Sequence, residues 1–157
     1  MALAIRSSAF AHNGPIPVRF TADGAEVSPP LECSGLPPEA QELALIVDDP
    51  DAPTSDPWVH WVLYKIPLGA ASWPETVAKI ESPPVPAGAV QGLNSWSGVG
   101  YGAPAPPRGH GVHHYRFRLF ALDVSLEVEV GLRKSQLLAA MEGHVCATAE
   151  LVGTYQR

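Results

Sequence analysis

The fold is decided in residues 43–61, which read LALIVDDPDAPTSDPWVHW. The hydrophobic run Leu43–Val47 ends in three aspartates that are broken by a proline, and His60 follows between two tryptophans. A strand core rarely ends in three acids, because burying a carboxylate is costly unless it is paired. The stretch therefore predicts a buried strand that leads into a polar site.

The rest of the chain also predicts mostly β-structure. Glu42–Val47, Trp58–Ile66 and Val112–Leu122 are the strong strand candidates. Trp58–Ile66 is apolar at both parities, which is typical of a strand covered on both faces. Weaker extended segments are expected at Leu3–Phe10, Val18–Phe20, Leu31–Ser34 and His144–Tyr155.

One short helix is expected near the C-terminus, over Gln136–Glu142, with Ser135 as its N-cap and Gly143 ending it. The region Ser82–Gly111 is rich in proline and glycine and has no helical period, so we expect a long functional loop there. Together these elements predict an antiparallel β-sandwich with little helix.

Composition limits the class of protein. A chain of 157 residues that is 46% hydrophobic and 17% charged predicts one folded domain over residues 1–157. The net charge of −6 and the lack of a basic stripe argue against nucleic acid as a partner. Cys33 and Cys146 are expected to be reduced core thiols. Arg6 interrupts the first apolar stretch and no segment has membrane-helix length, so we expect a cytoplasmic protein without stable membrane insertion.

Strand parity predicts which polar residues meet. Asp49 continues the face of the strand that carries Leu43, Leu45 and Val47, and His113 and Tyr115 share a face with Phe117 and Leu119. If the strands on either side of Asp49 form a hairpin, Asp49 and His60 fall at the same end, where His113 could join them. Polar groups on a core face need partners.

The chemistry expected of this cluster is the capture of an anion. A nearby aspartate raises the pKa of an imidazole, so two imidazoles and a tyrosine hydroxyl would supply donors to a phosphate-like group. The alternative is that Asp49 caps a turn and His60 is a hydrogen-bonded core histidine.

Other kinds of site are weaker. A metal site would draw on Asp49, His110, His113 and His114, but neighbouring residues of a strand point to opposite faces, so no metal and no cofactor is expected. The serines in residues 92–98 do not match a nucleophile elbow. Arg116 and Arg118 share the face opposite His113 and are expected to be surface charges or packing stems.

Several short motifs occur in an order that resembles the phosphatidylethanolamine-binding protein family, in its short bacterial and archaeal branch of Raf kinase inhibitor-like proteins. The resemblance covers nearly the whole chain. The motifs are Ser28-Pro-Pro-Leu31, Asp49-Pro-Asp-Ala-Pro53, Trp58-Val-His-Trp61, Gly100-Tyr-Gly102, Pro106-Pro-Arg-Gly109 and His113-His-Tyr115.

The resemblance implies a β-sandwich with Greek-key character and a small pocket for phosphate-like anions. It places the pocket on Asp49, His60, His113 and Tyr115, and implies a cis peptide bond before Pro53. Asp51, Pro53 and Pro106 belong to the structural signature of the family. Ala105 stands where the family has glycine or cysteine beside the pocket, and we expect it to narrow the mouth.

The leading hypothesis is a protein that binds a small anion or phospho-ligand, such as a phosphate-like group or a phospho-amine, and regulates or inhibits another enzyme. One alternative is a hydrolase that uses His60 or His113 as general base, although no credible nucleophile is present. Another is a protein-interaction module with a vestigial pocket. The resemblance also implies pairing as a homodimer, because relatives of this branch often pair.

Overall fold

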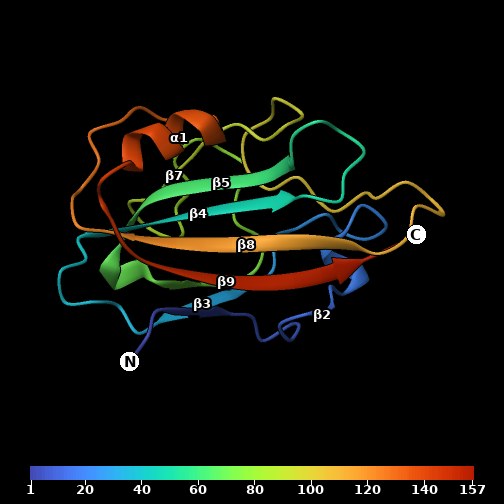
Figure 1. Ribbon diagram of the computed structural model, residues 1–157, viewed down its shortest axis with the longest axis horizontal. Helices are drawn as coiled ribbons and strands as arrows, with labels where there is room; N and C mark the ends of the chain where they lie inside the picture. Colours follow the sequence, from blue (N-terminus) through green and yellow to red (C-terminus); the bar gives the residue numbers. More distant parts are fainter.

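The computed structural model describes residues 1–157 and contains two β-sheets and one α-helix (Figure 1). The six-stranded sheet has the order β2 (Gly14–Pro15), β9 (Val145–Tyr155), β8 (His113–Leu122), β4 (Glu42–Asp49), β5 (Trp58–Pro67) and β7 (Val90–Gln91). The three-stranded sheet has the order β1 (Ala4–Arg6), β3 (Leu31–Ser34) and β6 (Ser72–Trp73). The helix α1 spans Lys134–Met141. The expectation of a mostly β fold with one short helix near the C-terminus is therefore confirmed.

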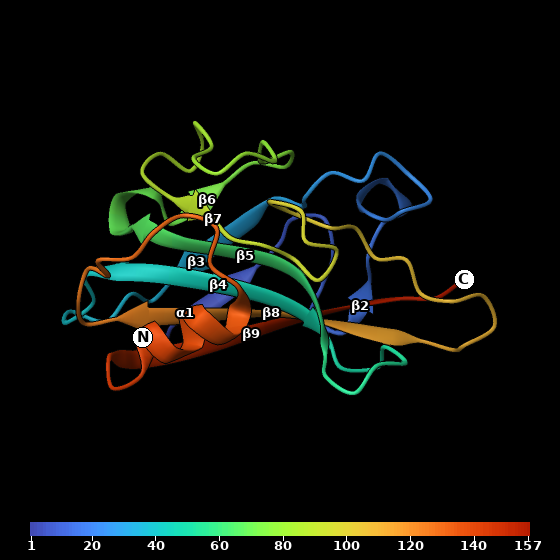
Figure 2. The same ribbon diagram turned by 90° about the horizontal axis from the view of Figure 1, so that it is seen from above.

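The large sheet is covered on both faces. Figure 2 shows α1 on one side of it and the strands β3 and β6 on the other. All eight residues of β4 are buried, and they alternate between the two sides. Leu43, Leu45 and Val47 join the larger core, whereas Ala44 and Ile46 join the core beneath α1. A strand in this position must be apolar at both parities, because neither face meets water.

The long central strands pair antiparallel. β4 pairs with β5 on one side and with β8 on the other, and β8 pairs with β9. Only the two-residue strand β2 runs parallel to its neighbour, β9. β8 therefore returns beside β4 after the long connection that follows β5, so residues far apart in the sequence meet in the middle of the sheet.

Some predicted elements were wrong in detail. Val18–Phe20 is a 3₁₀ turn rather than a strand, because Pro17 precedes it and its carbonyl accepts the amide hydrogen of Phe20 at 3.0 Å. Only Ala4–Arg6 of the first predicted strand pairs with a neighbour. The region 82–111 is not wholly irregular, since it contains β7 and a bridge between Leu93 and Val99.

The helix begins earlier than predicted. Arg133 is the N-cap, and its backbone amide donates to the Gln136 side chain at 2.8 Å, so Ser135 lies inside the first turn. The peptide bond before Pro53 is not cis; the cis bond lies between Val85 and Pro86. Cys33 and Cys146 are free, and each packs partly buried against the larger core. The one helix is too short and too polar to cross a bilayer.

Candidate functional site

The antiparallel pairing brings the predicted residues to one end of the sheet. Because β4 runs opposite to β5 and β8, its last residues lie beside the first residues of both. Asp49 is opposite Trp58, and Asp48 is opposite Arg116. The hairpin between β4 and β5 that the parity argument required is present, and the start of β8 adjoins it.

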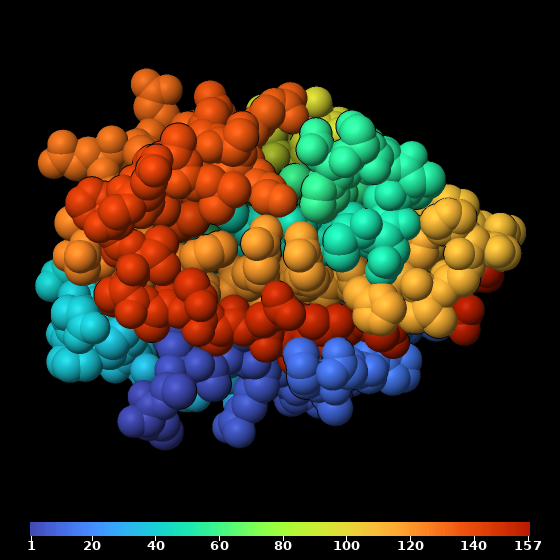
Figure 3. Space-filling model, viewed as in Figure 1, coloured from blue at the N-terminus to red at the C-terminus, as the bar shows by residue number.

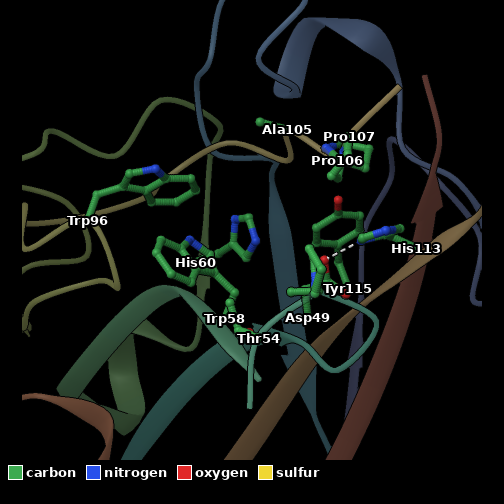
Figure 4. Close-up of a pocket in the computed structure, with 12 residues that line it drawn as sticks. Asp49, Thr54, Trp58, His60, Trp96, Ala105, Pro106, Pro107, His113 and Tyr115 are labelled. Carbon is green, nitrogen blue, oxygen red and sulfur yellow. Dashed lines mark hydrogen bonds and ion pairs between the residues drawn. The ribbon is translucent and has the colours of Figure 1, made fainter. Parts of the chain in front are cut away.

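A cavity of about 250 Å³ opens at this end of the sheet (Figure 4). All five predicted ligand residues line it, namely Asp49, His60, Ala105, His113 and Tyr115. Pro53 and Pro106 also line the cavity, whereas Asp51 does not. Two indoles that the sequence did not assign to the site, those of Trp58 and Trp96, form part of its wall.

Asp49 holds His113 rather than His60. Its Oδ2 accepts a hydrogen bond from Nδ1 of His113 at 2.6 Å, and its Oδ1 accepts the backbone amide of Asp51 at 2.8 Å. The other ring nitrogen of His113 lies 2.7 Å from Nδ1 of His110. Both nitrogens of His113 are thus engaged within the protein.

His110 is a residue of this site that the sequence argument considered only for a metal. It is exposed, between Gly109 and Gly111, which both have positive φ angles (74° and 95°). Two glycines in the left-handed region allow the chain to turn back on itself. The signal in the sequence was the Gly-His-Gly triplet just before the strand.

His60 is bonded to the backbone instead of to an acid. Its Nδ1 lies 2.6 Å from the carbonyl oxygen of Gly102, and the residue is 3% exposed. The ring sits between Trp96 and Tyr115, at centroid distances of 5.2 Å and 5.1 Å, and both contacts are edge-to-face (Figure 4).

The sequence predicted a raised pKa for the histidines of the pocket, and this prediction is wrong for His60. Burial lowers the pKa of His60 to about 4, and it outweighs the opposing effects of the bond to Gly102 and the charges of Asp49 and Asp48. His60 is therefore neutral at ordinary pH.

Two residues that line the cavity carry a buried donor without a partner, namely Trp58 with its indole N–H and Tyr115 with its hydroxyl. Tyr115 is 1% exposed and its hydroxyl has no hydrogen-bond partner in the protein. Burial, followed by the charge of Asp49, raises the pKa of this phenol well above its usual value, so the group remains an O–H donor. Buried polar groups are nearly always bonded, and an unbonded one that faces a cavity marks a place where a ligand can bind.

Asp48 and Asp51 have other partners. Asp48 is fully buried on the opposite face, where Arg116, Arg118 and Lys134 bind it at 2.9, 2.9 and 2.7 Å. Figure 3 shows this face, with β8 side chains lying between α1, β9 and the loop after β4. Arg116 and Arg118, which were expected to be surface charges or packing stems, are partly exposed and also bind a buried carboxylate, a role that the sequence did not predict.

Asp51 accepts two hydrogen bonds from His114, from its backbone amide at 2.7 Å and its Nδ1 at 2.8 Å. These bonds tie the turn after β4 to the start of β8. No group of three or more His, Cys, Asp or Glu side chains is arranged to hold a metal ion.

Comparisons with known proteins place this geometry in context. Residues 6–156 match the family described as phosphatidylethanolamine-binding protein. A UPF0098 protein of Methanothermobacter thermautotrophicus is 48% identical over 153 residues, which cover 98% of each chain.

Two solved structures are similar over nearly their whole length. The phosphatidylethanolamine-binding protein homologue of Chlamydia trachomatis superposes with a TM-score of 0.89 at 42% identity, over 99% of this chain and 98% of that one. Escherichia coli YbcL superposes with a TM-score of 0.92 at 27% identity, over 100% and 99% of the two chains.

Proposed function

Because the chain belongs to the phosphatidylethanolamine-binding protein family, we propose that the cavity at the end of β4 binds a small phosphate-like acid. In this proposal the protein is a ligand-binding regulator of another protein rather than an enzyme. The observation that carries it is the Tyr115 hydroxyl, a buried donor without a partner at the wall of the cavity.

The neighbours of Tyr115 support a binding role. The buried pair of Asp49 and His113 stands in the same wall, and each of its side-chain polar atoms makes one hydrogen bond within the protein, so the pair offers a rigid polar surface. No serine or cysteine lines the cavity. The one hydroxyl besides that of Tyr115, on Thr54, donates to the carbonyl of Asp56 at 2.6 Å. A hydrolase would need a nucleophile within reach of a general base.

The test compares two buried tyrosines. Tyr115→Phe removes only the unpartnered hydroxyl, so we expect the affinity for inorganic phosphate to fall about tenfold, the effect of one hydrogen bond to a charged group. The free energy of unfolding should stay constant or rise, because no bond within the protein is lost. Calorimetric titration and urea unfolding measure the two quantities.

Tyr64→Phe is the matched control. Tyr64 is equally buried, but its hydroxyl donates to the carbonyl of Glu129 and accepts the amide of Leu132, on the α1 side of the sheet. Removing the Tyr64 hydroxyl should lower the free energy of unfolding by about 1 kcal/mol and leave the affinity for phosphate unchanged. Equal phosphate affinity in wild type and Tyr115→Phe, or no binding of phosphate or phosphoethanolamine by the wild type, would refute the proposal.

A further inference from the structure

Given the binding role proposed above, we propose that the cavity selects an oxyanion that still carries an acidic proton. The ligand class is a phosphate monoester in its singly charged form, or inorganic phosphate, which keeps a proton in both its singly and its doubly charged forms. Sulfate and phosphodiesters should bind less well. Sulfate is fully deprotonated near neutral pH, and a phosphodiester has no acidic hydroxyl.

The tautomer of His60 decides which group this side chain offers to a ligand. A carbonyl oxygen can only accept, so the hydrogen bond to Gly102 requires the proton of the ring to be on Nδ1. A neutral imidazole then has a lone pair on Nε2. Nε2 makes no hydrogen bond within the protein, and His60 lines the cavity. His60 therefore offers the ligand an acceptor, not a donor.

The titratable groups near His60 do not reverse this state. Asp49 and, on the opposite face, Asp48 belong to β4, and His113 and Tyr115 belong to β8. The aspartates favour a charged imidazole, but burial is the larger effect and lowers the pKa of His60 to about 4. Trp96, which packs against the ring from the other side, is uncharged.

The cavity also contains a second acceptor. Each oxygen of Asp49 accepts one hydrogen bond, from Asp51 and from His113, and each has a further lone pair. A fully deprotonated anion would place its own lone pairs and charge against this carboxylate. The Tyr115 hydroxyl is a complementary donor in the same cavity.

A singly charged phosphate satisfies both kinds of group. Its P–OH can donate to Nε2 of His60 while another of its oxygens accepts from the Tyr115 hydroxyl. The two side chains are close enough for one ligand to reach both, since their ring centroids are 5.1 Å apart. Sulfate can only accept, so the lone pair of His60 would be left facing an oxygen lone pair. A site built to bond one group rejects the analogue that lacks it, and we expect at least about tenfold weaker sulfate binding.

The first test uses the wild-type protein. Phosphate and methylphosphonate are titrated calorimetrically between pH 5.5 and 8.5. Apparent affinity for methylphosphonate should fall as pH rises through its second pKa, because its dianion has no proton left to donate. Inorganic phosphate keeps one P–OH in its dianion, so its affinity should fall much less over the same range. An equal loss of affinity for both probes would assign the titration to the protein and overturn the inference.

The second test removes the acceptor. His60→Asn can still donate from its amide to the Gly102 carbonyl, but it has no atom at the place of Nε2. The preference for phosphate over sulfate should fall from about tenfold to near parity. His144→Asn, at a partly exposed histidine that pairs with Asp123 and does not line the cavity, is the control and should keep the full preference. An unchanged preference in His60→Asn would overturn the inference; if this variant does not fold, the two-probe comparison decides.

The third test separates monoesters from lipid-like diesters, and the inference from the function on which it rests. Phosphoethanolamine should bind more tightly than glycerophosphoethanolamine at pH 6. Equal or tighter binding of the diester, or of sulfate, would overturn the inference but leave an anion-binding site. Failure of all of these probes to bind would instead refute the proposed function itself.

Discussion

At the scale of single residues, Asp49 and His60 show what parity can and cannot predict. Parity placed Asp49, His113 and Tyr115 on the core face, and all three are buried there. It did not predict that Asp49 would bind His113 while His60 bonds to Gly102. Parity assigns a face but not a neighbour, and the register between β4 and β5 shifts between Val47 and Asp48.

The buried neutral His60 should make stability depend on pH. The pKa of His60 is about 4 in the folded protein, against 6.5 for an unperturbed histidine side chain. Between about pH 4 and pH 6.5 the unfolded chain therefore binds more protons than the folded one. The contribution to stability is fully present above pH 6.5 and is lost as pH falls to about 4, in total about 3 kcal/mol.

Urea unfolding at pH 7 and pH 4.5 measures this loss. We expect wild type to lose most of that free energy over the interval, whereas His60→Asn, which has no titrating group at this position, should change much less. Parallel losses in the two proteins would show that other groups control the acid sensitivity.

At the scale of elements, Asp48 joins three of them. It lies on β4 and binds two arginines of β8 and Lys134, the first residue of α1. Burial alone would raise its pKa, but the hydrogen bonds from Arg116 and Lys134 and the charge of Arg118 lower it overall. This buried cluster fixes the helix over the middle of the sheet.

Asp48→Asn should lower the free energy of unfolding at pH 7 by about 3–5 kcal/mol, because it leaves three cations without their buried partner. The folded pKa is depressed, so the stabilisation by Asp48 is present above the unfolded value near 3.9 and is lost as pH falls through the lower folded value. The difference in the free energy of unfolding between wild type and Asp48→Asn should therefore become smaller only in strong acid.

Asp123→Asn removes an exposed carboxylate that pairs with His144, and it serves as the control. Exposed pairs contribute about 0–1 kcal/mol. A loss in Asp48→Asn no larger than in this control, in guanidinium unfolding at pH 7, would contradict the structural role of the cluster.

The accuracy of the element prediction follows strand length. The long strands β4, β5, β8 and β9 lie within about two residues of their predicted bounds, because a run of apolar residues specifies burial locally. The two-residue strands β2, β6 and β7 carry no such pattern. Their pairing depends on the neighbour that reaches them.

At the scale of the whole molecule, the large sheet separates two cores with different tasks. The larger core lies between the sheets and extends to Tyr115, at the wall of the cavity. The smaller core lies under α1 and includes Leu137 and Met141, neither of which lines the cavity. Stability and binding can therefore be changed independently from the α1 side.

Leu137→Ala tests this separation. Leu137 is fully buried, so its truncation should cost about 2–5 kcal/mol of unfolding free energy. Phosphate affinity, measured by calorimetry at a temperature where the variant is folded, should match wild type. A large change in affinity would show that the two faces of the sheet are coupled.

The sequence by itself determined the long strands and the face on which Asp49, His113 and Tyr115 lie, since alternation is a local property. That these residues gather with His60 at one end of the sheet followed only from an assumed hairpin of the strands on either side of Asp49. The tertiary structure alone decided the chemistry at that end. The tautomer of His60 depends on a carbonyl 42 residues away, and Asp48 is held by side chains 68 to 86 residues away. Hydrogen-bond partners and the degree of burial set the charge of each group, and both arise only when distant segments pack together.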